Sequence, residues 1–153
     1  MKIATWNVNS VNARIEHLVK FIKKDQSDIY LIQELKCINE SFPYPEIEKL
    51  GYISYVEGQK AWNGVAILSK KKLKILNRKL PTFVEDVQSR FLETEIKINK
   101  IKKPIKLFCI YLPNGNPIET EKFDYKIKWM KKFNEYIFNL YDKNNPIIIG
   151  GDF

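Results

Sequence analysis

The sequence has few cysteines, a single histidine and no long apolar run. Its two cysteines, Cys37 and Cys109, lie far apart in 153 residues, which argues against a disulfide framework and indicates reduced thiols in a cytosolic protein. No stretch approaches about 18 consecutive apolar residues, so we expect no membrane span. The N-terminal MKIATWNVNS lacks the apolar core of a secretory signal. These absences predict a cytoplasmic protein with no membrane partner.

Arginine is also scarce, although the chain is basic. Only Arg14, Arg78 and Arg90 are arginines among 26 cationic side chains, and 18 carboxylates leave a net charge of +8. A basic excess favours polyanionic partners such as nucleic acid or anionic lipid. A lysine-rich proteome explains the charge equally well. The length is that of one ordinary domain, and 44% hydrophobic residues suffice for a real core.

Hydrophobic periodicity predicts a mixture of strands and helices. Strands are expected over residues 2–7, 28–33, 52–57, 64–69, 73–79, 91–98, 106–111 and from 147, and helices over 13–25, 45–51 and 121–143. In strand 91–98 the alternation places Glu93 and Glu95 on a wet face. The pattern predicts an α/β fold with antiparallel-rich sheets and helices packed outside.

The longest expected helix, 121–143, has one apolar face. The residues that recur there at helical spacing are Phe123, Ile127, Met130, Phe133, Ile137, Leu140 and Tyr141. We therefore expect this stripe to pack against a sheet.

Polar residues stand where four of the expected strands end. Asn7, Glu34, Tyr111 and Asp152 close or follow these strands, and Asn114 lies in the loop after one of them. Strand ends are rigid platforms, and oxygen ligands of this kind suit Mg²⁺. Each residue alone has a simpler explanation: a solvated acid, a turn cap, a half-buried strand aromatic or a helix cap. The spacing does not establish that they converge.

Five stretches resemble one known family. TWNVNS, LIQELK, GQKAWNGVAILSK, IYLPNGN and IIIGGDF occur in this order between residue 2 and residue 153. They resemble the exodeoxyribonuclease III family, the abasic-site endonuclease branch of the endonuclease/exonuclease/phosphatase superfamily. GQKAWNGVAILSK and YLPNGN narrow the resemblance to the branch that acts in DNA repair.

The resemblance implies the N-terminal half of a four-layered αββα sandwich, in which two mixed, antiparallel-rich sheets pack together with helices outside. In that family the GD motif continues into an Asn, and a second half supplies another Asp and a terminal Asp-His pair. Residues 1–153 are therefore expected to be a partial domain, inactive and aggregation-prone alone, and monomeric when full length. His17, on the expected helix 13–25, is expected to be a surface residue.

The family's activity is metal-dependent hydrolysis of double-stranded DNA, 5′ to abasic sites and at 3′ ends, with removal of nucleotides or 3′ blocks. The implied cofactor is Mg²⁺, with Mn²⁺ as an alternative. Glu34 would be the principal metal ligand with Asn7 beside it, and Asp152 would align or deprotonate the attacking water. Tyr111 would hydrogen-bond the scissile phosphate. By the same resemblance, Arg90 and Asn114 would contact DNA.

Two other interpretations remain open. One is a superfamily relative that acts on RNA or on a phospholipid headgroup, and the other is a non-catalytic DNA-binding fragment. Lysines in expected loops (Lys36, Lys60, Lys102 and Lys103) are either phosphate contacts or ordinary solvated side chains. Trp62 is either an exposed aromatic near DNA or a turn filler.

Overall fold

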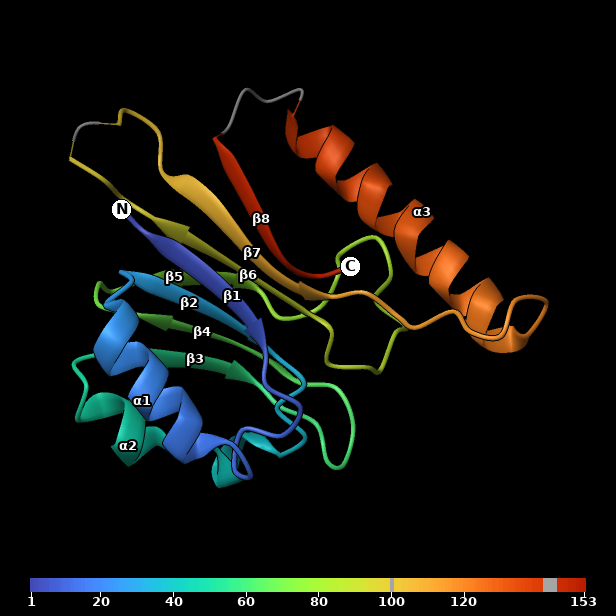
Figure 1. Cartoon of the computed structure of the whole chain (residues 1–153). Helices are drawn as coiled ribbons and strands as arrows, with labels where there is room; N and C mark the ends of the chain where they lie inside the picture. Colours follow the sequence, from blue (N-terminus) through green and yellow to red (C-terminus); the bar gives the residue numbers. More distant parts are fainter. Residues whose placement is uncertain (100, 142–145) are drawn as a thin grey trace.

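Two four-stranded sheets pack face to face, with helices covering their outer faces (Figure 1). The computed structural model describes residues 1–99, 101–141 and 146–153. The predicted end of the last helix, residues 142 and 143, therefore lies outside the described residues. The fold class expected from the sequence is confirmed. Within the described residues, no helix is long and apolar enough to span a bilayer.

The first sheet has the strand order β1-β2-β4-β3, formed by β1 (Ile3–Asn7), β2 (Ile29–Gln33), β4 (Val65–Ser69) and β3 (Ile53–Glu57). The strands β1 and β2 are parallel and are joined by helix α1 (Ile15–Asp25), whereas β4 runs antiparallel to both β2 and β3. A short 3₁₀ turn, η1 (Asn39–Ser41), and helix α2 (Tyr44–Glu48) lie between β2 and β3. The parallel pair places Asn7 beside Gln33 at one end of the sheet.

The second sheet has the order β5-β6-β7-β8, formed by β5 (Lys74–Asn77), β6 (Phe91–Ile96), β7 (Ile105–Tyr111) and β8 (Ile147–Asp152). Its parallel pair is β7 and β8, joined by helix α3 (Glu121–Tyr141). Tyr111 is in register with Asp152. Each sheet therefore contains one parallel βαβ unit whose strands deliver polar residues at their carboxyl ends.

The strand alternation divides the core into three layers. Leu31, Ile67, Leu92 and Leu107 belong to the cluster between the two sheets. The alternate side chains of β2 face α1, and those of β7 face α3. The edge strands β1 and β8 pack against each other across the sandwich. This packing brings the carboxyl ends of the two parallel units together (Figure 1).

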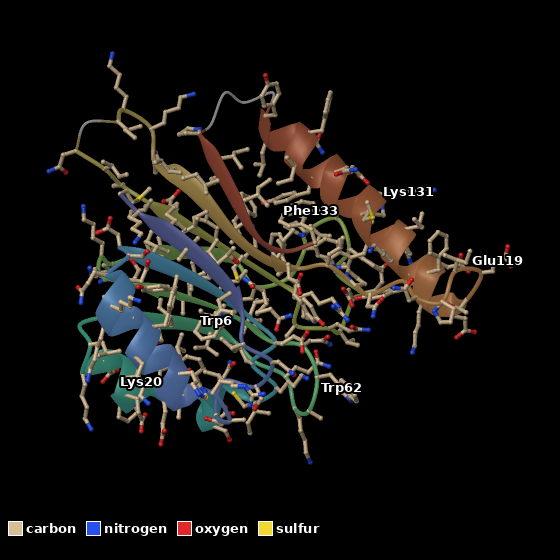
Figure 2. All side chains as sticks on the ribbon, in the orientation of Figure 1. Trp6, Lys20, Trp62, Glu119, Lys131 and Phe133 are labelled. Carbon is tan, nitrogen blue, oxygen red and sulfur yellow. The ribbon has the colours of Figure 1, made fainter. Side chains whose placement is uncertain are left out.

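The inner face of α3 differs from the predicted stripe. Met130 is 37% exposed and Tyr141 is 74% exposed, so their predicted burial is wrong. The fully buried residue is Trp129, which stacks on Phe133 with 5.3 Å between ring centroids. Figure 2 shows Phe133 on the side of α3 that faces the sheet. The large indole fills the layer over β7, and a helix that buries Trp129 must turn the neighbouring Met130 outward.

The prediction that Glu93 lies on a solvent-exposed face of β6 is also wrong. This side chain is fully buried because α3 covers that face of the sheet. Its carboxylate accepts hydrogen bonds from Lys106 Nζ at 2.8 Å and from the Tyr136 hydroxyl at 2.7 Å. A buried charge is tolerated when it is paired and hydrogen-bonded in this way. The network ties α3 to the sheet beneath it.

We expect Trp129→Ala to lower the free energy of unfolding by about 3–5 kcal/mol, because it empties a fully buried site. The matched control is Phe138→Ala on the exposed side of the same helix, which should change that free energy by less than about 0.5 kcal/mol. Urea unfolding followed by circular dichroism measures both. Equal losses in the two variants would contradict this packing of α3.

Candidate active site

Four of the residues predicted from strand ends meet in one hydrogen-bonded cluster. Asn7 Nδ2 donates to Glu34 Oε1 at 2.7 Å and to Asp152 Oδ2 at 2.7 Å. The hydroxyl of Tyr111 donates to the same Glu34 Oε1 at 2.8 Å. Asn7 and Glu34 come from the first sheet, whereas Tyr111 and Asp152 come from the second. We call these four residues the carboxylate cluster.

The loop that carries Glu34 is held from both sides by backbone hydrogen bonds. Ser10 N–H donates to the carbonyl oxygen of Glu34 at 2.8 Å, and Lys36 N–H donates to that of Asn63 at 3.0 Å. Glu34 itself has a φ of 55°, and Lys36 has a φ of 54°. Residues other than glycine rarely adopt this left-handed backbone conformation. They keep it where surrounding contacts hold the backbone in place. The carboxylate of Glu34 is thus presented by a rigid turn.

Asp152 is placed by the register of β8 and by the two glycines before it. A Cβ atom on Gly151 would lie 2.0 Å from the backbone oxygen of Ile110, and one on Gly150 would lie 2.5 Å from Leu31 Cδ1. The Leu112 N–H donates to the carbonyl oxygen of Asp152 at 2.9 Å. The glycine pair therefore allows β8 to approach both β7 and the first sheet, so that Asp152 reaches Asn7.

Electrostatics favours the ionised form of Glu34. Partial burial raises the pKa of this carboxyl, but hydrogen bonds from Asn7, Tyr111 and Lys36 outweigh burial and leave the pKa below its usual value. For Tyr111, burial and then the hydrogen bond to Glu34 raise the pKa to about 12. At neutral pH the cluster therefore pairs an ionised Glu34 with a protonated phenol.

Lys36 is the cation of the site, a role that the sequence did not reveal. Its ammonium lies 3.0 Å from Glu34 Oε2 and also donates to Asn9 Oδ1. Lys36 Nζ is 5.9 Å from the ring centroid of Trp62, whose side chain is 69% exposed on the loop before β4 (Figure 2). The sequence shows a cation two residues after an acid, which is a weak indication of an ion pair. Only the left-handed backbone at Glu34 and Lys36 brings the two side chains together.

The two predicted DNA contacts lie differently. Arg90 is 9% exposed, and its guanidinium lies 4.7 Å from the ring centroid of Tyr111. Its Nε donates to Gln88 at 2.7 Å, and Nη1 donates to the Tyr111 carbonyl oxygen at 3.2 Å. The exposed Asn114 accepts a hydrogen bond from Asn116 N–H. Arg90 thus adjoins the cluster directly, whereas Asn114 is bonded within its own loop.

The donor set of the carboxylate cluster fits a hard divalent cation. Glu34 and Asp152 supply carboxylate oxygens and Tyr111 a hydroxyl, whereas Asn7 turns its Nδ2 to both carboxylates. The Oδ1 of Asn7 accepts a hydrogen bond from Asn9 N–H at 3.0 Å. In the described part of the chain, no three His, Cys, Asp or Glu residues gather as a metal site. A cation held by few protein oxygens, with water and substrate completing its shell, is typical of Mg²⁺.

Other residues lie as their sequence context suggested. His17 is exposed on α1, as predicted. Both cysteines are buried and free, as expected for core residues. Burial raises the pKa of the Cys109 thiol to about 12, and Gln33 Nε2 donates to its sulfur at 3.3 Å. Neither thiol is therefore an activated nucleophile.

Comparison with known proteins places the chain in one family. Residues 4–153 match the model of the endonuclease/exonuclease/phosphatase family. The chain is 38% identical to exodeoxyribonuclease III of Haemophilus influenzae, an alignment that covers 99% of this chain and 57% of the relative. It is 25% identical to an exodeoxyribonuclease of Bacillus subtilis, covering 58% of that protein. The chain thus spans little more than half the length of these relatives.

Solved structures show the same fold. A 3′–5′ exonuclease (NExo) from Neisseria meningitidis superposes with a TM-score of 0.89 at 30% identity, over all of this chain and 57% of the other. An AP endonuclease from Archaeoglobus fulgidus superposes with a TM-score of 0.86 at 30% identity, over 99% and 56%. A 3′ phosphatase NExo bound to a product DNA hairpin gives a TM-score of 0.88.

The lowered pKa of Glu34 predicts how stability depends on pH. A carboxyl with a lowered folded pKa stabilises the fold above its unfolded pKa of about 4.3, and that stabilisation is lost as pH falls through the folded pKa. The unchanged protein should be more stable than Glu34→Gln. The difference in free energy of unfolding should be constant from pH 7 to about 5 and become smaller below that pH. Urea unfolding at several pH values measures it. Glu46→Gln on α2 is the control, and a difference that persists to pH 3 would contradict the assignment.

Proposed function

The chain belongs to the endonuclease/exonuclease/phosphatase family, and on that basis we propose that it acts in the metal-dependent hydrolysis of DNA phosphodiesters, in the manner of exodeoxyribonuclease III. The proposed substrate is double-stranded DNA, cut 5′ to abasic sites or trimmed at 3′ ends. The observation that carries the proposal is the carboxylate cluster, in which Asn7 links Glu34 to Asp152 across the two sheets. Mg²⁺ is the proposed cofactor, with Mn²⁺ as an alternative.

The proposed mechanism assigns one task to each residue of the cluster. Glu34, with Asn7 beside it, would hold the metal, which would supply neutralisation of charge on the phosphate oxygens. Asp152, whose Oδ2 lies 2.7 Å from Asn7 Nδ2 at the end of β8, would orient the attacking water and accept its proton. Tyr111 keeps its proton at neutral pH because its pKa is about 12. That proton, donated to Glu34 Oε1 in this structure, would turn to a phosphate oxygen of the bound substrate.

Arg90 and Asn114 are proposed to contact DNA beside this cluster. Arg90 lies against Tyr111, and its hydrogen bond to the Tyr111 carbonyl oxygen also supports the loop after β7. Asn114 is exposed further along that loop. A cation and an amide next to the phosphate-binding phenol suit contacts to the strand that flanks the scissile bond.

The choice of DNA rests on the relatives. Two relatives in sequence are named exodeoxyribonucleases, and one structural neighbour holds a product DNA hairpin. Since the chain spans about 57% of the length of the first of these, the complete activity is proposed for the protein as the cell makes it. A location in the cytoplasm and a monomeric state are proposed with it.

The direct test is incision of a 5′-labelled duplex with one abasic analogue, in Mg²⁺ and in EDTA. We expect the protein as the cell makes it to cleave immediately 5′ to the lesion in Mg²⁺ only, and residues 1–153 alone to be inactive. Glu34→Gln should lower the rate by at least about 100-fold, since changes to residues that merely support metal ligands already cost about 10–100-fold. Glu46→Gln, on the outer helix α2, should keep the full rate.

Four results would contradict the proposal. Equal rates in Mg²⁺ and EDTA would contradict metal dependence. An unchanged rate in Glu34→Gln would contradict the assignment of Glu34 as a metal ligand. Faster cleavage of an RNA duplex or of a phosphoinositide headgroup than of abasic DNA would move the protein to another branch of the superfamily. Binding of DNA without cleavage under any condition would leave a non-catalytic DNA-binding role.

A further inference from the structure

The positive charge of the chain is concentrated at the end of the sandwich that lies away from the carboxylate cluster. The turn between β4 and β5 carries the lysines of residues 70–72, Lys74 begins β5, and the turn between β6 and β7 carries Lys97, Lys102 and Lys103. All seven side chains are exposed. We call these seven lysines the basic surface.

The strand registers fix its position. Ser69, where β4 ends, pairs with Ile29 at the start of β2, and Ile96 pairs with Ile105 at the start of β7. Glu34 and Tyr111 lie at the other ends of β2 and β7. Strands of five and seven residues separate their two ends by roughly 13–20 Å. That separation exceeds the screening length of about 8 Å at physiological salt, so the site carboxylates do not neutralise the basic surface.

The two turns form one continuous surface. Lys72, Lys74 and Lys97 line a shallow hollow together with Glu95. Lys97 and Lys102 line the neighbouring hollow. Lys97 therefore joins the two.

Among the described residues, Glu95 and Asp28 are carboxylates close to the basic surface that have cationic or hydrogen-bonding partners. Glu95 pairs with Lys74 at 3.5 Å. Asp28 accepts a hydrogen bond from the Lys2 N–H at 2.7 Å, which lowers its pKa, and the charges of Lys70 and Lys71 lower it further. These two acids stand against the exposed lysines of residues 70–72, Lys74, Lys97 and Lys102, which leaves an excess of positive charge.

A lysine-rich composition does not account for this arrangement. Compositional bias alone does not bring lysines from two separate turns onto one surface, as the registers of β2, β4, β6 and β7 do here. Such unbalanced like charges are stabilised by a polyanion.

We propose that the basic surface binds the phosphate backbone of double-stranded nucleic acid, as a second contact area separate from the carboxylate cluster. Lysine ammonium groups act as point charges that suit phosphates without reading sequence. The residues that line the two hollows include no aromatic side chain on which unpaired bases could stack. Among these lining residues, Ile101 is the one large apolar side chain that is exposed. A lipid surface would need more apolar area to insert.

The test is the salt dependence of binding to a lesion-free 20-base-pair duplex in EDTA, measured by fluorescence anisotropy on the full protein. Removing one phosphate-binding lysine reduces the steepness of log Kobs against log salt by about 0.9. The quadruple variant Lys72→Gln, Lys74→Gln, Lys97→Gln and Lys102→Gln should therefore reduce that slope by about 3 to 4. Its affinity should fall at low salt and converge with that of the unchanged protein at high salt.

The matched control carries the same change in charge on other faces: Lys20→Gln, Lys49→Gln, Lys122→Gln and Lys131→Gln. All four residues are exposed, and Lys20 and Lys131 lie on the outer sides of α1 and α3 (Figure 2). The control should leave most of the slope intact. Equal slopes for the two quadruple variants would overturn the proposal, because they would make the effect one of net charge alone.

Two further arms separate this proposal from other outcomes. Vesicles of anionic lipid replace the duplex in one arm, and loss of vesicle binding with duplex binding unchanged would overturn the proposal in favour of a lipid partner. In the other arm, abasic incision by the unchanged protein is measured in parallel with duplex binding. If abasic incision fails while this slope change holds, the proposed nuclease function falls and the basic surface stands.

Discussion

The side-chain amide of Asn7, held between the carboxylates of Glu34 and Asp152, is the interaction on which the rest of the site depends. Glu34 follows β2 of the first sheet, and Asp152 ends β8 of the second. One amide can reach both only if the two sheets pack with the carboxyl ends of their parallel strands at the same end. The facing of β1 against β8 and the glycine pair before Asp152 meet this requirement. The fold thus brings two negative charges together around one amide, an arrangement that a divalent cation would stabilise.

Much of this was predictable because strand ends are visible in a sequence. Asn7, Glu34, Tyr111 and Asp152 could each be placed at the end of an apolar run, and the resemblance to a known family grouped them. The ion pair of Lys36 with Glu34 was not predictable, since it depends on left-handed backbone at both residues. Periodicity also cannot say which face of a sheet a distant helix covers. Glu93 was therefore expected in water but lies beneath α3. For the same reason the rotation of α3 that buries Trp129 rather than Met130 came only from the structure.

The charges of the molecule are divided between its two ends. At one end, carboxylates, amides and a phenol are arranged with few cations, of which Lys36 and Arg90 are each engaged by a site residue. At the other end, lysines far outnumber the acids near them. The first arrangement suits a metal and the making and breaking of bonds at one phosphate. The second suits weak, sequence-independent attraction to many phosphates. The strands fix the distance between them, so each end can be altered without disturbing the other.

The proposed divalent metal, held by Glu34 with Asn7 beside it and next to Asp152, can be tested by Mn²⁺ titration followed by NMR. Mn²⁺ broadens signals from nuclei close to it. Small amounts of Mn²⁺ should erase the side-chain amide signals of Asn7, together with the backbone amide signals of Glu34 and Asp152. The side-chain amide of Gln26, which donates to the Lys23 carbonyl oxygen before the opposite end of β2, should stay sharp, and Mg²⁺ should restore the erased signals. Uniform broadening, or selective broadening elsewhere in the chain with Asn7 unaffected, would contradict a metal site at Glu34.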